Sequence, residues 1–189
     1  MDDLFLHACC GPCATVSVPA WRTEGVEPRL WFWNPNLQPA VEHERRRAGL
    51  EQYAAAEEVA VIGAIDAAPR AAWRHWAASL SVTPAEARCA TCVRLRLGDA
   101  AAAAAANGAS RFSTTLSVSP YQRHDLIRAA GTAAADEHGV DFVYLDLRGR
   151  FRDSYAESRR LGLYRQSYCG CAASKWEAWR QRRAPRVTG

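Results

Sequence analysis

Short apolar runs alternate with longer stretches of helical periodicity along this 189-residue chain. Runs of this length are typical of buried strands, and helices between successive strands favour a mostly parallel sheet. We expect strands at 4–8, 29–33, 59–62, 111–115 and 141–145. We expect helices at about 13–24, 39–58, 69–79, 85–106 (closed by Asn107-Gly108) and 121–138, and a helical end from 151 with an interruption at 164–171. The sequence therefore predicts an α/β fold, a single domain (1–189) with a mostly parallel, Rossmann-like sheet flanked by helices.

Three chemically distinctive segments directly follow predicted strands. They are Cys9-Cys10, Asn34-Pro35-Asn36 and Ser117-Val118-Ser119-Pro120. Ligands of parallel sheets bind beyond the carboxyl ends of the strands. We therefore expect these segments to gather on one edge of the sheet.

Length and composition exclude several classes of protein. The chain has the mass of one ordinary domain, 20.8 kDa, with 49% apolar and 23% charged residues, a globular composition. No run approaches the roughly 18 apolar residues of a membrane span. The start, Met1-Asp2-Asp3-Leu4, lacks the positive region of a secretory signal. We expect a soluble, cytoplasmic protein without a membrane partner.

Positive charge is concentrated at the C-terminal end, in a predicted basic helical region at 151–189 and the residues just before it. Residues 148–189 carry Lys175 and ten arginines against Asp153, Glu157 and Glu177. Such an imbalance favours a polyanion such as a phosphate backbone, although a solvated helix face is the competing explanation. The arginines are Arg148, Arg150, Arg152, Arg159, Arg160, Arg165, Arg180, Arg182, Arg183 and Arg186. We expect Trp176 and Trp179, three residues apart in this region, to pack rather than to stack on bases.

The seven cysteines form three tight groups. An odd number of cysteines without an export signal indicates metal binding or redox chemistry rather than structural disulfides. The groups are Cys9, Cys10 and Cys13; Cys89 and Cys92; Cys169 and Cys171.

The first two groups together suit an iron–sulfur cluster. Cys89-Ala90-Thr91-Cys92 alone fits zinc, iron–sulfur or thiol redox chemistry about equally. Cys9 and Cys10 precede a predicted helix, whose N-terminus stabilises thiolates. Adjacent cysteines fit one tetrahedral zinc poorly, whereas a cubane offers each a separate iron. We therefore favour a 4Fe–4S cluster over zinc, with inert buried thiols as the remaining alternative.

Cys169-Gly170-Cys171 is a third kind of site. A disulfide across one residue closes a small strained ring, and strained disulfides are readily reduced. Glycine between the cysteines relieves backbone crowding. The motif favours electron transfer or a second metal pair over a permanent staple.

In this arrangement the chain resembles the QueH family, the cobalamin-independent epoxyqueuosine reductases of tRNA queuosine biosynthesis. The resemblance runs from Leu4 to about Lys175 and includes all seven cysteines. Its motifs are Leu6-His7-Ala8-Cys9-Cys10-Gly11-Pro12-Cys13, Asn34-Pro35-Asn36, Arg88-Cys89-Ala90-Thr91-Cys92, Ser113-Thr114-Thr115-Leu116-Ser117-Val118-Ser119-Pro120 and Tyr164-Arg165-Gln166-Ser167-Tyr168-Cys169-Gly170-Cys171.

The resemblance implies that the chain reduces the epoxide of epoxyqueuosine at the wobble position of tRNA, the last step of queuosine synthesis. It implies a 4Fe–4S cluster on Cys9, Cys10, Cys89 and Cys92, and an additional mononuclear iron nearby. Cys169 and Cys171 would be the redox pair. Cys13 would be either a ligand of the second iron or a spectator. An external donor such as a ferredoxin or flavodoxin would supply electrons. Gln38 departs from the histidine often found two residues after Asn-Pro-Asn in the family.

Removing an epoxide oxygen also needs a Lewis acid or a proton donor, because an alkoxide leaves poorly. The candidates are Tyr121, Tyr168 and His7. Each has a structural alternative: a buried histidine with satisfied hydrogen bonds, or a tyrosine that packs.

Two other functions would each explain part of the sequence. A zinc-stabilised nucleic-acid-binding module without catalysis would explain the CxxC motif and the basic end, but it gives no role to Cys9-Cys10 or Cys169-Gly170-Cys171. An adenine-nucleotide-binding PP-loop enzyme would share the α/β order. It needs a glycine- and serine-rich phosphate loop after the first strand, where Cys9-Cys10-Gly11-Pro12-Cys13 stands instead.

Overall fold

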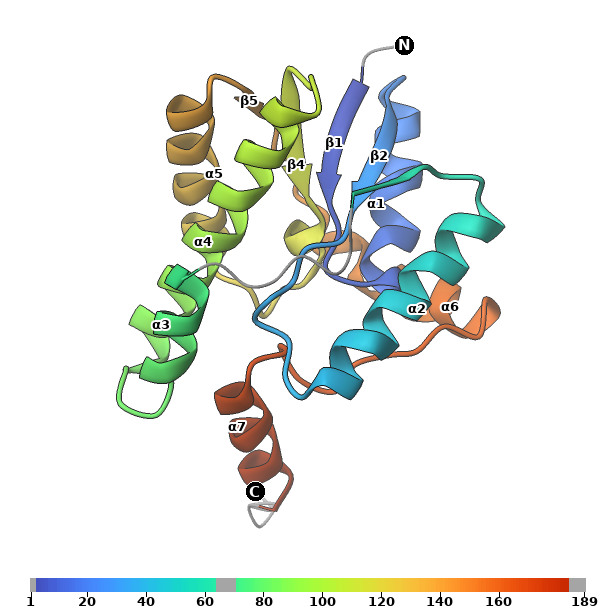
Figure 1. The fold of residues 1–189 in the computed structure, drawn as a ribbon. Coiled ribbons are helices and arrows are strands. Elements are labelled where there is room, and N and C mark those ends of the chain that lie inside the picture. The colour runs from blue at the N-terminus through green and yellow to red at the C-terminus, as the bar shows by residue number, and fades with distance from the viewer. Residues whose placement is uncertain (1–2, 64–70, 184–189) are drawn as a thin grey trace.

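The computed structural model describes residues 3–63 and 71–183, which form a five-stranded parallel sheet between two layers of helices (Figure 1). The strand order is β3-β2-β1-β4-β5. The strands are β1 (Asp3–His7), β2 (Glu27–Trp31), β3 (Val61–Ile62), β4 (Arg111–Thr114) and β5 (Asp141–Phe142). The predicted single-domain α/β fold with a Rossmann-like parallel sheet is confirmed.

The central strand β1 is buried on both faces, as expected of a parallel strand covered by helices. Leu4 and Leu6 pack toward α1 (Gly11–Thr23) and α2 (Ala40–Ala56). Phe5, which points to the opposite face, packs into the cluster that contains Leu97 and Ile127. One strand therefore joins the two halves of the core.

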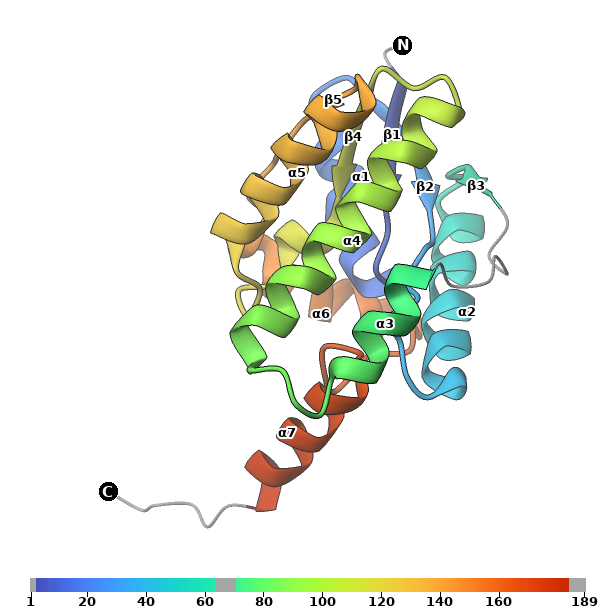
Figure 2. The ribbon, with the colours of Figure 1, turned by 60° about the vertical axis from the view of Figure 1, so that its left-hand side comes forward.

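The helices divide between the two faces of the sheet (Figure 2). On one side α1 contacts α2 and α6 (Phe151–Arg160). On the other, α4 (Ala85–Ala106) packs along α5 (His124–His138), with the short α3 (Ala71–Ser79) beside α4. The last helix, α7 (Ala172–Arg183), extends from the end of this body and carries the chain toward its C-terminus (Figures 1 and 2). No helix within the described ranges is long and apolar enough to cross a membrane.

The strand order reverses at β1, which lies between β2 and β4. The carboxyl ends of the strands at such a reversal are the usual ligand site in parallel sheets. Cys9 and Cys10 lie there, and the Asn34 amide after β2 donates to the Ala8 carbonyl across a distance of 2.9 Å. The Cys9 amide donates to Thr115 Oγ1 just after β4 at 2.9 Å. The predicted convergence is thus confirmed for Cys9-Cys10 and Asn34, whereas the residue after β4 that meets Cys9 is Thr115 rather than the predicted segment 117–120.

Four strand predictions extend too far along the chain: 4–8 ends at His7 and 29–33 ends at Trp31, and 111–115 and 141–145 also end early. The segment 111–115 ends as a strand at Thr114, because the Thr114 hydroxyl accepts from the Leu116 amide and starts a 3-10 helix, η1 (Thr115–Val118). The last strand ends at Phe142 and not at residue 145: its pairing with β4 stops at Phe112, although β4 continues to Thr114. Residues 143–147 instead have no regular secondary structure, and the Leu147 amide donates to the Ser117 carbonyl in η1.

The other boundaries shift by a few residues. Helix α1 begins two residues before the predicted start, at Gly11, and α5 begins at His124 rather than at 121. Residues 69–70 of the predicted third helix lie outside the described residues. The predicted cap of α4 is confirmed: Asn107 is the C-cap and Gly108 has a positive φ of 69°.

Candidate metal and redox site

The first three cysteines surround the start of α1. Cys10 is the extended N-cap residue, and Pro12 occupies the first turn, where its missing amide proton costs nothing. Gly11 allows this turn to approach α2, since a Cβ there would lie 2.3 Å from the Gly49 carbonyl oxygen. Glycine at position 11 thus sets how closely the cysteine-bearing turn packs on α2.

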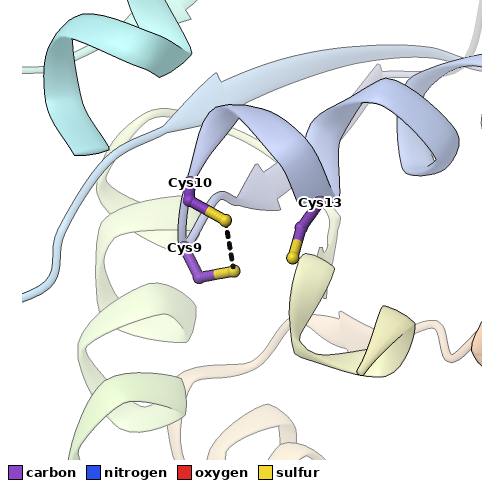
Figure 3. Close-up of side chains that lie close together, drawn as sticks. All are labelled: Cys9, Cys10 and Cys13. Carbon is purple, nitrogen blue, oxygen red and sulfur yellow. Dashed lines mark hydrogen bonds between the residues drawn. The ribbon is translucent and has the colours of Figure 1, made fainter. Parts of the chain in front are cut away.

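The sulfur atoms of Cys9, Cys10 and Cys13 face one another (Figure 3). Cys9 Sγ and Cys10 Sγ are 3.6 Å apart, and all three lie within 4.8 Å of one another. All three residues are buried. Three thiols brought together in the core at a helix N-terminus can bind a metal centre.

Of these three thiols, Cys9 is the first to lose its proton. Contacts with the Cys10 and Cys13 thiols, the nearby Arg96 guanidinium and the Thr115 hydroxyl hold the pKa of Cys9 well below its usual value. The contact with Cys13 lowers the pKa of Cys10, but the contact with Cys9 and burial outweigh it and raise that pKa to about 12. Contacts with Cys10 and Cys9 raise the pKa of Cys13 well above its usual value.

Arg96 is a buried cation near this group of thiols. Its side chain donates to Asn34 Oδ1 at 2.5 Å, and its Nε has no hydrogen-bond partner. Within the described part of the chain no carboxylate lies at ion-pair distance from it. Its charge helps to lower the pKa of Cys9, and at Cys92 it only opposes the rise in pKa that burial causes. Because a buried charge needs a counter-charge, the Cys9 thiolate is the group suited to supply one among the described residues.

The remaining four cysteines form a second group. Cys92 lies beside Cys171 in a small apolar cluster built on Trp73 and Trp76. Burial raises the pKa of Cys92 to about 12 and raises that of Cys89, and both are raised further by the charges of Cys169 and Cys171. Cys89 and Cys169 are exposed. Among described residues, neither Cys89 nor Cys92 belongs to a group of three ligand atoms within 4.8 Å.

A buried ion pair holds the Cys169-Gly170-Cys171 loop. Arg46 donates to Glu42 at 2.8 Å and to the carbonyl oxygens of Tyr168 and Cys169, each at 2.9 Å. Gly170 has a φ of 139°, and a Cβ there would lie 2.4 Å from Leu37 Cδ2. The predicted relief of crowding by this glycine therefore has a specific cause, the positive φ and the nearby Leu37 side chain.

Several polar side chains at the thiols were not predicted from the sequence. Thr115 donates to Cys9 Sγ at 3.2 Å, Gln166 to Cys10 Sγ at 3.2 Å and Gln122 to Cys169 Sγ at 3.5 Å. Thr115 and Gln166 lie inside the recognised motifs, which is the one signal that could have found them. Arg46 and Arg96 are arginines within helices that carry several others, so nothing in the sequence distinguishes them.

The three predicted proton donors occupy different surroundings. His7 is fully buried, with Nδ1 2.8 Å from Thr114 Oγ1 and Nε2 3.2 Å from the Trp33 carbonyl. Burial, with the Arg96 charge, lowers its pKa to about 3, so these contacts favour the structural alternative. The Tyr168 hydroxyl donates to the Gln38 carbonyl at 2.5 Å. Tyr121 is 84% exposed, one residue before Gln122.

Gln38 takes part in the site through its backbone. Its amide donates to the Gly170 carbonyl at 2.8 Å, and its carbonyl accepts from Tyr168. These two bonds hold the cysteine loop without any ring at position 38.

The basic C-terminal region is only partly free for phosphates. Arg148, Arg150 and Arg160 form ion pairs with carboxylates, and Arg165 lies over the Tyr155 ring. Arg186 lies outside the described residues. The two tryptophans pack on each other, with ring centroids 5.4 Å apart, but not into the core as expected of packing residues: Trp176 is 62% exposed and Trp179 is 40% exposed. Within the described part of the chain, α7 buries none of its residues.

Comparison with known proteins gives one consistent result. The family described as "Epoxyqueuosine reductase QueH" matches residues 4–177. Epoxyqueuosine reductase QueH of Dehalococcoides mccartyi is 35% identical over 182 residues, covering 96% of this chain and 97% of that protein. The protein of the same name from Thermotoga maritima is 29% identical, covering 94% of this chain and 92% of its own length.

A solved structure shares the fold alone. The predicted tRNA methyltransferase subunit from Methanocaldococcus jannaschii matches with a TM-score of 0.58 at 10% identity, over 84% of this chain and 75% of that chain. The family match, in contrast, spans the cysteine groups at the carboxyl end of β1 and at the start of α4, as well as the loop before α7. The chain is therefore a member of the QueH family of epoxyqueuosine reductases, which are oxidoreductases.

Proposed function

We propose that this protein reduces the epoxide of epoxyqueuosine in tRNA to the alkene of queuosine. Overall, the epoxide takes up two electrons and two protons, both carbon–oxygen bonds break, and the oxygen leaves as water. The observation that carries the proposal is the meeting of three buried thiols at the carboxyl end of β1 in a chain of this family.

The residues present fit an iron–sulfur cluster. Arg96 is a buried cation with an unpartnered Nε and no carboxylate at ion-pair distance among the described residues, between the thiols of the first and second groups. An anionic, thiolate-bound cluster would supply both a counter-charge and a hydrogen-bond acceptor for it. Cys9, Cys10, Cys89 and Cys92 would hold a 4Fe–4S cluster, with Cys13 next to them as a candidate ligand of a further iron.

When bound, the cluster supplies electrons one at a time. Cys169 and Cys171, as a dithiol, hold two electrons and two protons, which they release when a disulfide forms between them. Gln122 donates to the Cys169 sulfur, and Arg46 fixes the carbonyl of the same residue. Both contacts orient the exposed thiol at the surface where a large substrate can reach it.

Protons at the leaving oxygen would come from tyrosine hydroxyls at this edge. Tyr168 lies next to Cys169, and burial raises its pKa, which keeps the hydroxyl protonated at neutral pH. Tyr121 precedes Gln122 and is exposed. His7, with both ring nitrogens engaged in the core, remains the least suited of the predicted donors.

The partners follow from the same reaction. The substrate is tRNA that carries epoxyqueuosine at the wobble position, and a modified base within a loop must be turned out of its stack before it reaches the thiols. An external electron donor such as a ferredoxin or flavodoxin would reduce the disulfide back to the dithiol and would supply the electrons of the cluster.

The test is reduction of epoxyqueuosine in purified tRNA by anaerobically prepared protein, read by mass spectrometry of the nucleosides. We expect loss of one oxygen atom from the modified nucleoside. Cys169→Ser should keep the iron and the visible absorption but lose the reduction, whereas Cys89→Ala should lose both. A colourless protein that holds one zinc and leaves the nucleoside unchanged would instead support the zinc-binding module. Normal reduction by the Cys169→Ser protein would remove this residue from the mechanism.

A further inference from the structure

Helix α7 starts directly after the Cys169-Gly170-Cys171 loop and presents an apolar groove to solvent. The groove has a volume of about 630 Å³. Its lining comes from α7 and from the segment before α2: Gln38, Pro39, Ala172, Lys175, Trp176 and Trp179. Indole rings this exposed are uncommon on a monomeric protein, and they usually mark a surface that a binding partner covers.

The two tryptophans form a fixed aromatic pair. Their ring centroids are 5.4 Å apart in an edge-to-face arrangement, and Arg183 lies over the Trp179 ring at 4.3 Å. Trp179 thus contacts both Trp176 and Arg183, whereas Trp176 is 62% exposed. A large, flat and rigid ring is a suitable surface for a planar partner.

The charge around the groove is positive. Lys175, Arg180 and Arg182 are exposed and have no carboxylate partner among the described residues. The one acidic residue of α7, Glu177, is paired with Arg88 at 2.5 Å. The ion pair therefore both fixes α7 on α4 and removes the negative charge from the groove side of the helix.

The groove is joined to the redox loop. The backbone amide of Gln38, a groove residue, donates to the Gly170 carbonyl at 2.8 Å, and Ala172 directly follows Cys171. The Gly170 amide in turn donates to the Ser174 hydroxyl in the first turn of α7 at 3.1 Å. The groove therefore adjoins the backbone of the loop that carries Cys169.

We propose that this groove binds single-stranded RNA of the substrate, with an unpaired base stacked on Trp176 and its phosphates on Lys175, Arg180 and Arg182. Aromatic rings interleaved with cations are the features that proteins use for unpaired bases, since every base has a face to stack and every nucleotide a phosphate. The inference rests on the proposed function, because it takes the RNA to be the tRNA that the redox loop acts on. It adds a binding surface for the nucleotides next to the reacting one.

The test is the dissociation constant of the complete protein for a fluorescent, unmodified anticodon stem–loop RNA, measured by anisotropy. Stacking on an aromatic ring typically contributes enough that Trp176→Ala should raise the dissociation constant at least about tenfold, whereas Trp176→Phe should change it less than about threefold. Val82→Ala, a change at an exposed apolar residue outside the groove, is the matched control and should have no effect. Arg180→Gln should reduce the slope of log affinity against log salt by about 0.7, the value for one phosphate of a single strand.

An unchanged RNA affinity in Trp176→Ala protein that keeps wild-type circular dichroism would overturn the inference. If the same protein also bound a reduced ferredoxin or flavodoxin more weakly, the result would assign the groove to the electron donor. Neither result touches the proposed function, which is tested separately by nucleoside reduction with wild-type protein. Conversely, tight RNA binding through Trp176 without any reduction would refute the proposed function alone.

Discussion

Removal of the Arg46 side chain should both destabilise the protein and loosen the cysteine loop. The guanidinium is buried, with an exposed side-chain fraction of 3%, and its partner Glu42 has one of 5%. It donates to the carboxylate and to the carbonyl oxygens of Tyr168 and Cys169. Arg46→Met keeps most of the chain length but leaves the Glu42 charge with only the Tyr164 hydroxyl, which donates to it at 2.6 Å.

The expected size follows from that uncompensated charge. Breaking a buried ion pair by removing one partner typically costs about 3–5 kcal/mol. Glu42→Gln/Arg46→Met removes both charges, so its cost should fall below the sum of the two single changes by about 2 kcal/mol or more. The carbonyl oxygens of Tyr168 and Cys169 lose their donor in either Arg46 variant, so the double change does not restore the loop.

Urea unfolding of the four proteins under anaerobic, reducing conditions, followed by tryptophan fluorescence, gives the free energies of unfolding. The rate at which a bulky thiol reagent modifies Cys169 reports on the loop, and we expect it to rise in both proteins that lack Arg46. A cost below about 1 kcal/mol for Arg46→Met, additive with Glu42→Gln, would show that the pair does not hold this part of the fold.

Three further changes test other parts of the structure. Gly170→Ala should lower the free energy of unfolding by about 1–3 kcal/mol, because φ is 139° and the new Cβ meets Leu37; an unchanged urea midpoint would contradict this. His7, held neutral by a pKa of about 3, takes up a proton more readily when unfolded, so stability is complete above about pH 6.5 and falls as the pH drops toward 3. The loss should be about 2 kcal/mol at pH 5, and the pH series of His7→Gln protein should lack it. Asp99→Asn should cost about 1–3 kcal/mol, since Trp33 and Trp73 both donate to Asp99 Oδ2 at 2.7 Å; equal unfolding curves would refute it.

The sheet was predictable because local pattern and long-range position agree. The apolar run at 4–8 and the short β-like segment at 111–115 form neighbouring strands, mostly buried, and the segments after them carry the chemistry. The length of β5 was not predictable from its apolar run, since its pairing with β4 stops at Phe112 although β4 continues to Thr114. The exposure of the α7 tryptophans was not predictable either, because an indole on a helix is buried only if another element covers it.

The site, like the fold, could be predicted only in part from the sequence. The cysteines were predicted as ligands because their residue type and spacing restrict the chemistry, and the structure brings Cys9, Cys10 and Cys13 together. The cations that balance them were not predicted. Arg96 reaches Asn34, which is 62 residues away, and Arg46 reaches Cys169, which is 123 residues away. Only the fold selects these two from the many arginines of the chain.

The most direct test of the account is an anomalous-scattering map at the iron edge, from crystals of the anaerobically prepared protein. The account predicts iron at the carboxyl end of β1, bonded to the sulfur atoms of Cys9 and Cys10 from one side and of Cys89 and Cys92 from the other. Iron bonded to only one of these pairs, or a map without iron at any of the four sulfur atoms, would contradict it.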